Sequence, residues 1–275
     1  MDFRALLALA LLAACSGERS TLPLASASAK PARIISLDFC ADQYVLKLAD
    51  RQNILALSQE AGMNHSYLRG DTENIPLVTP SAEHVLAFQP DLIVRSYGGG
   101  PNAERFYQQA GIPVITIGWA GDMEAIKTVT QTVADGLGQS ERGQALVADI
   151  DARLAALPRR IDAPTILYMT PTGVTAGEAT LIGNLIEQAG LTNFEQRPGW
   201  HALPLERLTR DQPDAVATSF YDSTALAHDI WSAARHPIAR KQISTKPTVN
   251  LPGAWTACGA WFALDAVEAL AGAKP

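Results

Sequence analysis

Short apolar runs alternate with stretches of helical periodicity from Arg33 onward. Four runs have the composition of buried strands, at 34–37, 54–57, 92–94 and 114–117. Helical spacing lies between them, at 42–49, 81–88 and 102–110. The pattern resumes after Pro164, with strands expected at 165–169, 214–218 and 248–251. Such alternation predicts an α/β fold of two lobes, each with a mainly parallel sheet covered on both faces.

The segment 122–160 has no strand pattern and is expected to connect the lobes. Apolar residues recur at helical spacing from Ile126 to Leu137, and Ser140 can cap a second helix that stops before Pro158. At about 1.5 Å per residue, a helix from Ser140 to Leu157 spans roughly 27 Å, enough to reach from one lobe to the other. A helical connection of this kind predicts lobes that move little relative to each other.

An internal repeat supports the division into two lobes. Residues 83–94 align without gaps to residues 206–217, and Glu, Gln, Pro and Asp coincide. Each copy predicts a short helix that is stopped by proline and followed by a strand. The two lobes are therefore expected to share one plan.

The N-terminus has the pattern of an export signal. An apolar run from Ala5 to Ala14 is too short to span a bilayer, and it ends in Cys15 in a segment that resembles a bacterial lipobox, which predicts lipidation of Cys15. Cleavage after Ala27 or Ala29 is the alternative. The expected organisation is a signal peptide, a flexible tether, an N-terminal lobe, connecting helices and a C-terminal lobe, at 1–15, 16–32, 33–121, 122–160 and 161–275.

Composition and motifs exclude several function classes. The 22 Lys and Arg residues are outnumbered by 28 Asp and Glu, and no basic run occurs, so nucleic acid is not an expected partner. No serine-nucleophile elbow, His-Glu-x-x-His or Cys-x-x-Cys motif is present, so no catalytic residue is predicted. The five histidines show no metal-ligand spacing, so no metal site is predicted.

After the export signal, the chain carries in order the segments RIISLDFCADQYVLKLAD, SAEHVLAFQPDLIVRS, NAERFYQQAGIPVITI, LERLTRDQPDAVATS and LPGAWTACGAWFALDAVEAL. This order resembles the cobalamin/ferric-siderophore class of substrate-binding proteins of ABC importers, over nearly everything from Arg33 onward. The resemblance implies two Rossmann-like lobes joined by a long backbone helix, with the ligand in the cleft between them. It also implies a periplasmic monomer that meets a permease and its ATPase.

Aromatic residues follow the ends of the expected strands, where ligands bind in parallel α/β sheets. The resemblance places Trp200 and Trp255 where cobalamin-binding members use tryptophans, and we expect them to face each other across the cleft. Filling of the core is the alternative for these rings, and a surface salt bridge is the alternative for the cationic candidates. The ligand-binding candidates are Trp200, Trp255, Tyr97, Trp119, Tyr221, Arg95 and Arg197.

Two further pairs of residues carry expectations. The resemblance implies that Glu83 and Glu206, one in each lobe, dock to basic residues of the permease. A favourable charge in the first helical turn is the alternative. Cys40 and Cys258 could form one disulfide in an oxidising compartment or remain separate buried thiols.

The sequence therefore favours a binding protein that captures a large metal chelate, a ferric siderophore or a corrinoid, and delivers it to a permease. It holds no cofactor of its own in this hypothesis. A haem or bare-metal receptor is the alternative in the same transport class. An exported enzyme acting on a corrinoid or chelate is the alternative from another class.

Overall fold

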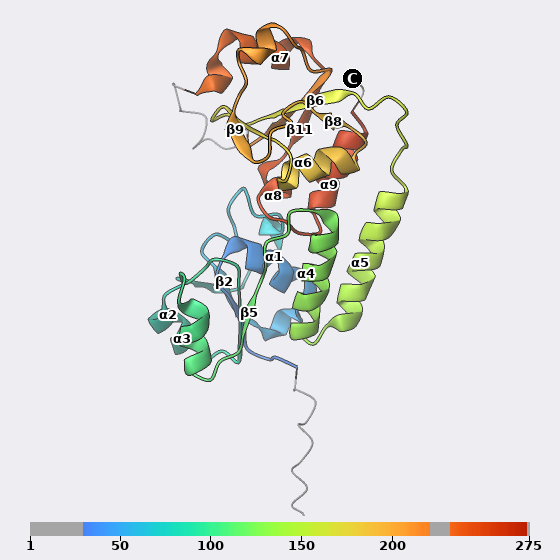
Figure 1. The fold of residues 1–275 in the computed structure, drawn as a ribbon. Helices are drawn as coiled ribbons and strands as arrows, with labels where there is room; N and C mark the ends of the chain where they lie inside the picture. The colour runs from blue at the N-terminus through green and yellow to red at the C-terminus, as the bar shows by residue number, and fades with distance from the viewer. Residues whose placement is uncertain (1–29, 221–231, 274–275) are drawn as a thin grey trace, which may run out of the picture.

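The computed structural model describes residues 30–220 and 232–273, which form two α/β lobes (Figure 1). The sheet of the N-terminal lobe is entirely parallel, in the order β3-β2-β1-β4-β5. Its strands are β1 (Ile34–Ser36), β2 (Ile54–Ser58), β3 (Leu77–Val78), β4 (Leu92–Arg95) and β5 (Val114–Thr116). The two-residue strand β3 was not predicted, because two residues after Pro76 are too short for a strand pattern.

Helices cover both faces of this sheet, which explains its continuous apolar runs. Ile34 packs into the cluster that holds α1 (Phe39–Leu48), whereas Ile35 packs into the cluster that holds Val85 and Tyr107. Those two residues belong to α2 (Ala82–Ala87) and α3 (Ala103–Gln109). Single 3₁₀ turns, η1 (Arg51–Asn53) and η2 (Arg69–Asp71), complete the lobe.

The C-terminal lobe repeats the plan with a parallel sheet in the order β11-β10-β6-β8. Its strands are β6 (Thr165–Met169), β8 (Thr192–Asn193), β10 (Ala215–Ser219) and β11 (Thr248–Leu251). An antiparallel pair of β7 (Val174–Ala176) and β9 (Trp200–Ala202) extends beside it. The remaining elements are α6 (Leu181–Gln188), α7 (Pro237–Thr245), α8 (Gly253–Thr256), α9 (Ala263–Ala271), η3 (Arg207–Thr209) and η4 (Ala233–Arg235).

Two packed helices connect the lobes. They are α4 (Met123–Gly136) and α5 (Ser140–Ala155), and the chain after α5 reaches the C-terminal lobe (Figure 1). Gly143 lets them approach, because an added Cβ there would lie 2.5 Å from the Ala134 Cβ. The expectation that Ser140 caps α5 is wrong: Gln139 holds the cap position without a side-chain hydrogen bond, and Ser140 is the first helical residue.

The repeat has a structural role in both lobes. Asp91 accepts hydrogen bonds from the backbone N–H of Ala32 and Arg33, just before β1. Asp214 accepts from the Thr165 N–H and hydroxyl at the start of β6. Each Pro-Asp pair therefore ties the strand that it begins to the neighbouring strand of its sheet.

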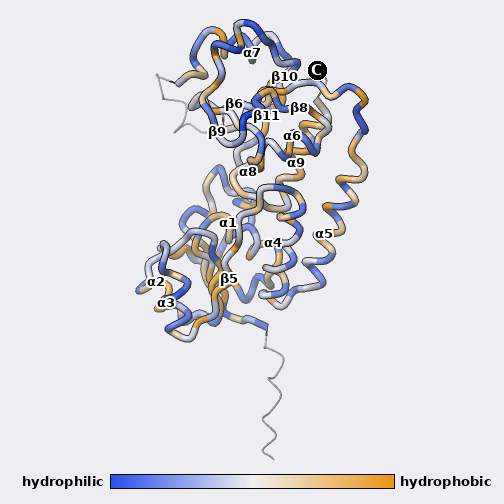
Figure 2. The backbone as a smooth tube through the Cα atoms, in the orientation of Figure 1, coloured by the Kyte–Doolittle hydropathy of each residue, from blue (hydrophilic) through white to orange (hydrophobic). Residues whose placement is uncertain are grey.

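The largest hydrophobic cluster among the described residues contains side chains of both lobes. The segment after α8 lies where the lobes meet, and Phe262 stacks on Tyr67 of the N-terminal lobe with ring centroids 4.5 Å apart. Tyr44 makes an edge contact with Trp261 at 5.4 Å. In Figure 2 hydrophobic stretches lie mainly inside the lobes, and hydrophilic stretches lie along outer helices such as α7. Within the described ranges, no helix is long and apolar enough to cross a bilayer.

Candidate functional site

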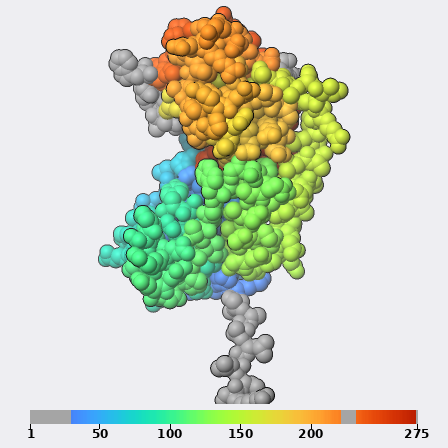
Figure 3. All heavy atoms as spheres, in the orientation of Figure 1, coloured from blue at the N-terminus to red at the C-terminus, as the bar shows by residue number. Residues whose placement is uncertain are grey.

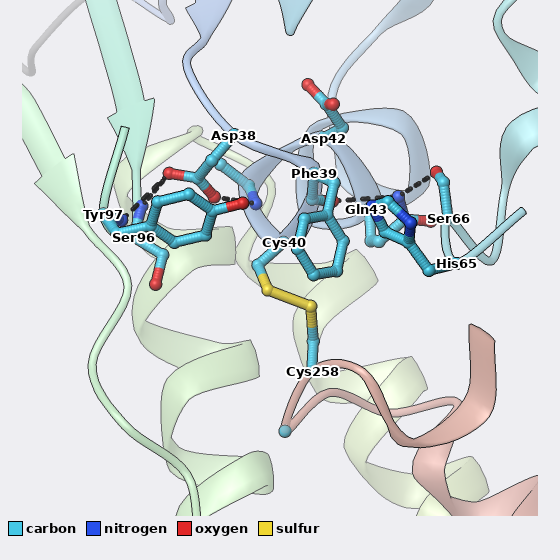
Figure 4. Close-up of a disulfide and its surroundings, with 12 residues drawn as sticks. Asp38, Phe39, Cys40, Asp42, Gln43, His65, Ser66, Ser96, Tyr97 and Cys258 are labelled. Carbon is cyan, nitrogen blue, oxygen red and sulfur yellow. Dashed lines mark hydrogen bonds between the residues drawn. A yellow bond between two sulfur atoms is a disulfide. The ribbon is translucent and has the colours of Figure 1, made fainter. Parts of the chain in front are cut away.

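The carboxyl ends of the two sheets meet between the lobes. A disulfide joins Cys40, in the first turn of α1 after β1, to Cys258, just after α8 and β11, with Cα atoms 5.9 Å apart (Figure 4). Ala120, which follows β5, lies against Gly259. The molecular surface narrows between the lobes in Figure 3. Residues at the carboxyl ends of both sheets can therefore reach a ligand held between the lobes.

Asp38 fixes the floor of this region on the side of the N-terminal lobe. Its carboxylate is fully buried and accepts hydrogen bonds from the backbone N–H groups of Ser96, Tyr97 and Gly98 at 2.6 to 3.0 Å. The other oxygen accepts from the Ala41 N–H and caps α1. One side chain thus sets both the start of α1 and the loop that follows β4.

Asp42 and Gln43, one turn further along α1, hold two more loops. Asp42 accepts from the backbone N–H of Ser58 at 2.9 Å and from its hydroxyl at 2.6 Å. Gln43 donates to the Ser66 hydroxyl and accepts from the Leu68 N–H. Burial, the larger effect, outweighs these hydrogen bonds and raises the pKa of Asp42 to about 6.

Tyr97 is exposed on this floor and belongs to a small cluster of polar and aromatic side chains. Its ring lies 6.1 Å from Phe39, which in turn contacts His65 edge-on at 4.5 Å (Figure 4). The Tyr97 hydroxyl donates to Glu60 at 2.8 Å. Burial of the hydroxyl, and then its bond to Glu60, raise the pKa of Tyr97 well above its usual value. The phenol is therefore neutral at any physiological pH.

Two tryptophans add exposed aromatic surface, one from each lobe. Trp119 follows β5 and is 82% exposed, and Trp200 on β9 is 53% exposed. Trp200 makes an edge contact at 6.1 Å with Tyr168, which ends β6 and is buried. The half-exposed ring of Tyr97, at 50%, completes the set. These three exposed rings are candidates for stacking against a flat ligand.

The other aromatic candidates are placed differently. Trp255 lies on α8 in the same lobe as Trp200, is half-buried and packs against the large core. The two indoles therefore do not face each other from opposing lobes, and that expectation is wrong. Tyr221 lies outside the described residues.

Both cationic candidates are held by other groups of the protein. Arg95 is only 6% exposed and donates to the carbonyl oxygens of Gly98 and Gly100 at 2.8 and 3.0 Å, which shapes the glycine-rich turn. Arg197 donates through two nitrogens to Glu195 at 3.0 and 2.8 Å. The exposed Arg197 therefore carries its own counter-charge.

The remaining candidates are exposed carboxylates of the two lobes or lie outside the described residues. Glu83 is exposed in the first turn of α2, and Glu206 is exposed directly before η3. The short helix expected after Glu206 is only the single 3₁₀ turn η3, and the Thr209 hydroxyl donates to the Glu206 carbonyl there. Cys15 lies outside the described residues. Among the described residues, no group of three or more metal-ligating side chains comes together.

Asp38, Asp42, Gln43 and Glu60 were missed from the sequence. The first three stand in the segment Leu37–Gln43, where polar residues interrupt an otherwise apolar strand-to-helix junction. Buried polar groups need partners, so that interruption was the available signal. Nothing in the sequence marks the distant partners Ser58 and Tyr97.

Two lobes with parallel sheets, a connection made of two packed helices and exposed aromatic side chains on both lobes define the architecture of a two-lobed binding protein. Residues 34–228 match the family described as periplasmic binding protein, and the chain belongs to this family.

Known proteins agree with this assignment. Cobalamin-binding proteins from two strains of Halobacterium salinarum are 27% identical to the chain, over 72% of it. The match covers 58% of their length, so the chain spans less than two thirds of these relatives.

Similar solved structures include the periplasmic haem-binding protein RhuT from Roseiflexus sp. RS-1, with a TM-score of 0.67 and 22% identity over 87% of this chain and 95% of that one. The periplasmic vitamin B12-binding protein BtuF of Vibrio cholerae has a TM-score of 0.60 and 19% identity, over 88% of this chain and 96% of that one. At these identities the two structures establish the fold alone.

Proposed function

We propose that the region between the lobes binds a corrinoid, a bulky metal chelate of low charge, and that the protein delivers it to an ABC permease. The observation that carries this proposal is the set of exposed rings on both lobes, Tyr97 and Trp119 after β4 and β5 of one lobe and Trp200 beside Tyr168 of the other. A corrin macrocycle offers a broad face for such rings.

The aromatic surface is large enough to matter. An aromatic side chain buries on the order of 200 Å², and apolar area contributes about 25 cal/mol per Å² as an upper limit. Covering the exposed half or more of three rings would contribute roughly 8 kcal/mol before the cost of ordering the complex. A micromolar complex needs about 8.2 kcal/mol after that cost is subtracted, so the three rings would supply a large part of the binding free energy and other contacts would supply the rest.

Electrostatics favours a ligand with little negative charge. The two arginines predicted for the site are already engaged, Arg95 by loop carbonyls and Arg197 by Glu195. Glu60 adds a carboxylate beside Tyr97. A ferric tricatecholate, with several negative charges, would meet no free guanidinium from either candidate. The 27% identical relatives are named as cobalamin-binding, which agrees with a corrinoid.

Haem is the second candidate, because Tyr97 and His65 lie near each other and both residue types can ligate haem iron. RhuT and BtuF, which share the fold, are named for haem and for vitamin B12. We place haem second because the 27% identical relatives are named as cobalamin-binding.

The test is a calorimetric titration of the purified protein with cyanocobalamin, hemin, a ferric tricatecholate and a ferric trihydroxamate. We expect cyanocobalamin to bind most tightly, and Trp200→Ala and Tyr97→Ala each to weaken it at least tenfold, about 1.4 kcal/mol. Phe106→Ala is the matched control, since Phe106 is an exposed ring on the outer helix α3. Absence of corrinoid binding, or an equal loss in Phe106→Ala, would contradict the proposal.

A further inference from the structure

A hollow lies in the C-terminal lobe, away from the region between the lobes. It has a volume of about 920 Å³ and runs along α7. Ala239 of α7 packs in the cluster that contains Leu167 and Val216, on one face of the sheet. Ile166 and Ala217, on the other face, belong to the core shared with the N-terminal lobe. The hollow is therefore on the outer side of the lobe, where α7 lies at the end far from the N-terminal lobe (Figure 1).

The charge of this region is opposite to that of the whole protein. The chain has a formal net charge of −6, yet residues 230–264 contain four Lys or Arg residues and no Asp or Glu. Three of the four, Arg235, Arg240 and Lys241, line the hollow and are exposed. A concentration of cations in an acidic protein attracts negatively charged ligands and raises their rate of encounter.

The rest of the lining is mainly apolar. Pro171, Pro237 and Ile243 contribute to the wall. The Ser232 hydroxyl donates to the Pro171 carbonyl oxygen, which fixes that side of the hollow to the chain before η4. A preformed cavity with apolar walls and a few convergent charged groups has the character of a small-molecule site.

We propose that this hollow binds a small organic anion with an apolar body. Arg240 and Lys241 bind its phosphate or carboxylate group, and Pro171, Pro237 and Ile243 pack against its body. A guanidinium and an ammonium together suit such oxygens, because the first binds in a fixed fork and the second as a point charge. The site is separate from the aromatic region between the lobes and does not depend on the proposed transport ligand.

The test compares three probes by isothermal titration calorimetry on the whole protein: 1-naphthyl phosphate, 1-naphthol and inorganic phosphate. If charge and apolar surface act together, 1-naphthyl phosphate binds at least tenfold more tightly than either of the other two. Arg240→Gln with Lys241→Gln weakens it at least tenfold. Arg159→Gln with Lys246→Gln removes two exposed or partly exposed cations outside the hollow and leaves the affinity within twofold of wild type.

Three results would overturn the proposal. The wild-type protein could fail to bind 1-naphthyl phosphate at all. Both double variants could lose affinity equally, which would mean attraction by net charge alone. Trp200→Ala could abolish binding while Arg240→Gln with Lys241→Gln leaves it intact, which would place the probe between the lobes.

Discussion

Two buried carboxylates, Asp38 and Asp42, stand at the start of α1 and have different hydrogen-bond partners. Asp38 accepts four backbone N–H groups, whereas Asp42 meets one N–H and one hydroxyl, both from Ser58, with Asp38 itself nearby. Desolvation therefore dominates for Asp42 and raises its pKa from 3.8 to about 6. Asp42 holds one of the loops that shape the site, so its protonation bears on the geometry of the site.

The raised pKa of Asp42 predicts a defined pH dependence of stability. Its protonated form is favoured by folding, so its contribution is fully present below pH 3.8 and is lost as the pH rises to about 6. The Asp42→Asn variant keeps the shape and loses this titration. Its free energy of unfolding should therefore gain about 2 kcal/mol relative to wild type between pH 4 and pH 7.

Urea unfolding of the two proteins at both pH values measures this gain. Asp149→Asn, at an exposed position on α5, is the control and should follow wild type. Parallel pH profiles for wild type and Asp42→Asn would show that Asp42 ionises normally in the fold.

At the scale of elements, the main strands could be predicted because both faces of each sheet are covered. Short apolar runs such as 92–94, bounded by turn residues, are typical of strands that are buried on both faces. The pair of β7 and β9 could not be predicted in the same way, since Trp200 and Ala202 are exposed and the segments are short. Helix α1 begins at Phe39, before the expected residue 42, because Asp38 caps it.

The site was only partly predictable, because the sequence shows the position of a side chain but not its partners in the fold. The position of an aromatic residue after a strand is visible in the sequence, and Tyr97 and Trp119 are at such positions. Whether a charged residue is free is not visible, because Arg95 finds its partners in the backbone of its own turn. Trp255 likewise depends on how α8 packs against the core.

The contact between Gly259 and the segment after β5 predicts an effect on the arrangement of the lobes. A Cβ at residue 259 would lie 2.1 Å from the Ala120 carbonyl oxygen, so one backbone must move. We expect Gly259→Ala to lower the free energy of unfolding by about 1 to 3 kcal/mol and to weaken ligand binding. Gly118→Ala, where nothing lies within 4 Å of an added Cβ, should do neither. Denaturant unfolding of both variants measures the two free energies of unfolding. A wild-type value for Gly259→Ala would contradict the close approach of Gly259 to Ala120.

At the scale of the whole molecule, several ties hold the lobes together. The Tyr67 hydroxyl donates to Asp265 at 2.6 Å, and Arg153 of α5 binds Asp265 and Glu268 of α9 at 2.7 Å. The disulfide between Cys40 and Cys258 adds a covalent link over a separation of 218 residues. These links connect the N-terminal lobe, α5 and α9, and we therefore expect the lobes to move little relative to each other.

Removal of the disulfide should lower the free energy of unfolding while the protein keeps its fold. Closing so long a loop restricts the unfolded chain, and loss of a disulfide typically costs about 2 to 5 kcal/mol. We expect this loss in Cys40→Ser with Cys258→Ser, measured by denaturant unfolding against the wild type in its oxidised form. An equal stability of the two proteins would mean that the link contributes nothing to folding.

The exposed residues Glu83 and Glu206 are predicted to affect transport but not ligand binding. Glu83 and Glu206 stand on different lobes, and charged residues at the rim of an interface set orientation and encounter more than affinity. Reversal of both to Lys should abolish ligand uptake and stimulation of the permease ATPase, with ligand affinity unchanged. Reversal of Glu104 and Glu141 to Lys, first-turn carboxylates of α3 and α5, is the control and should transport normally. Normal uptake in the Glu83/Glu206 variant would leave both residues as local helix charges.

The most direct measurement of the central claim is a crystal structure of the protein with the chelate that binds most tightly in the titration panel. The account predicts the chelate between the lobes, with one face against Trp200 and the other side against Tyr97 and Trp119, and the disulfide intact beneath it. A chelate bound along α7, or one held without contact to any of these three rings, would contradict the account.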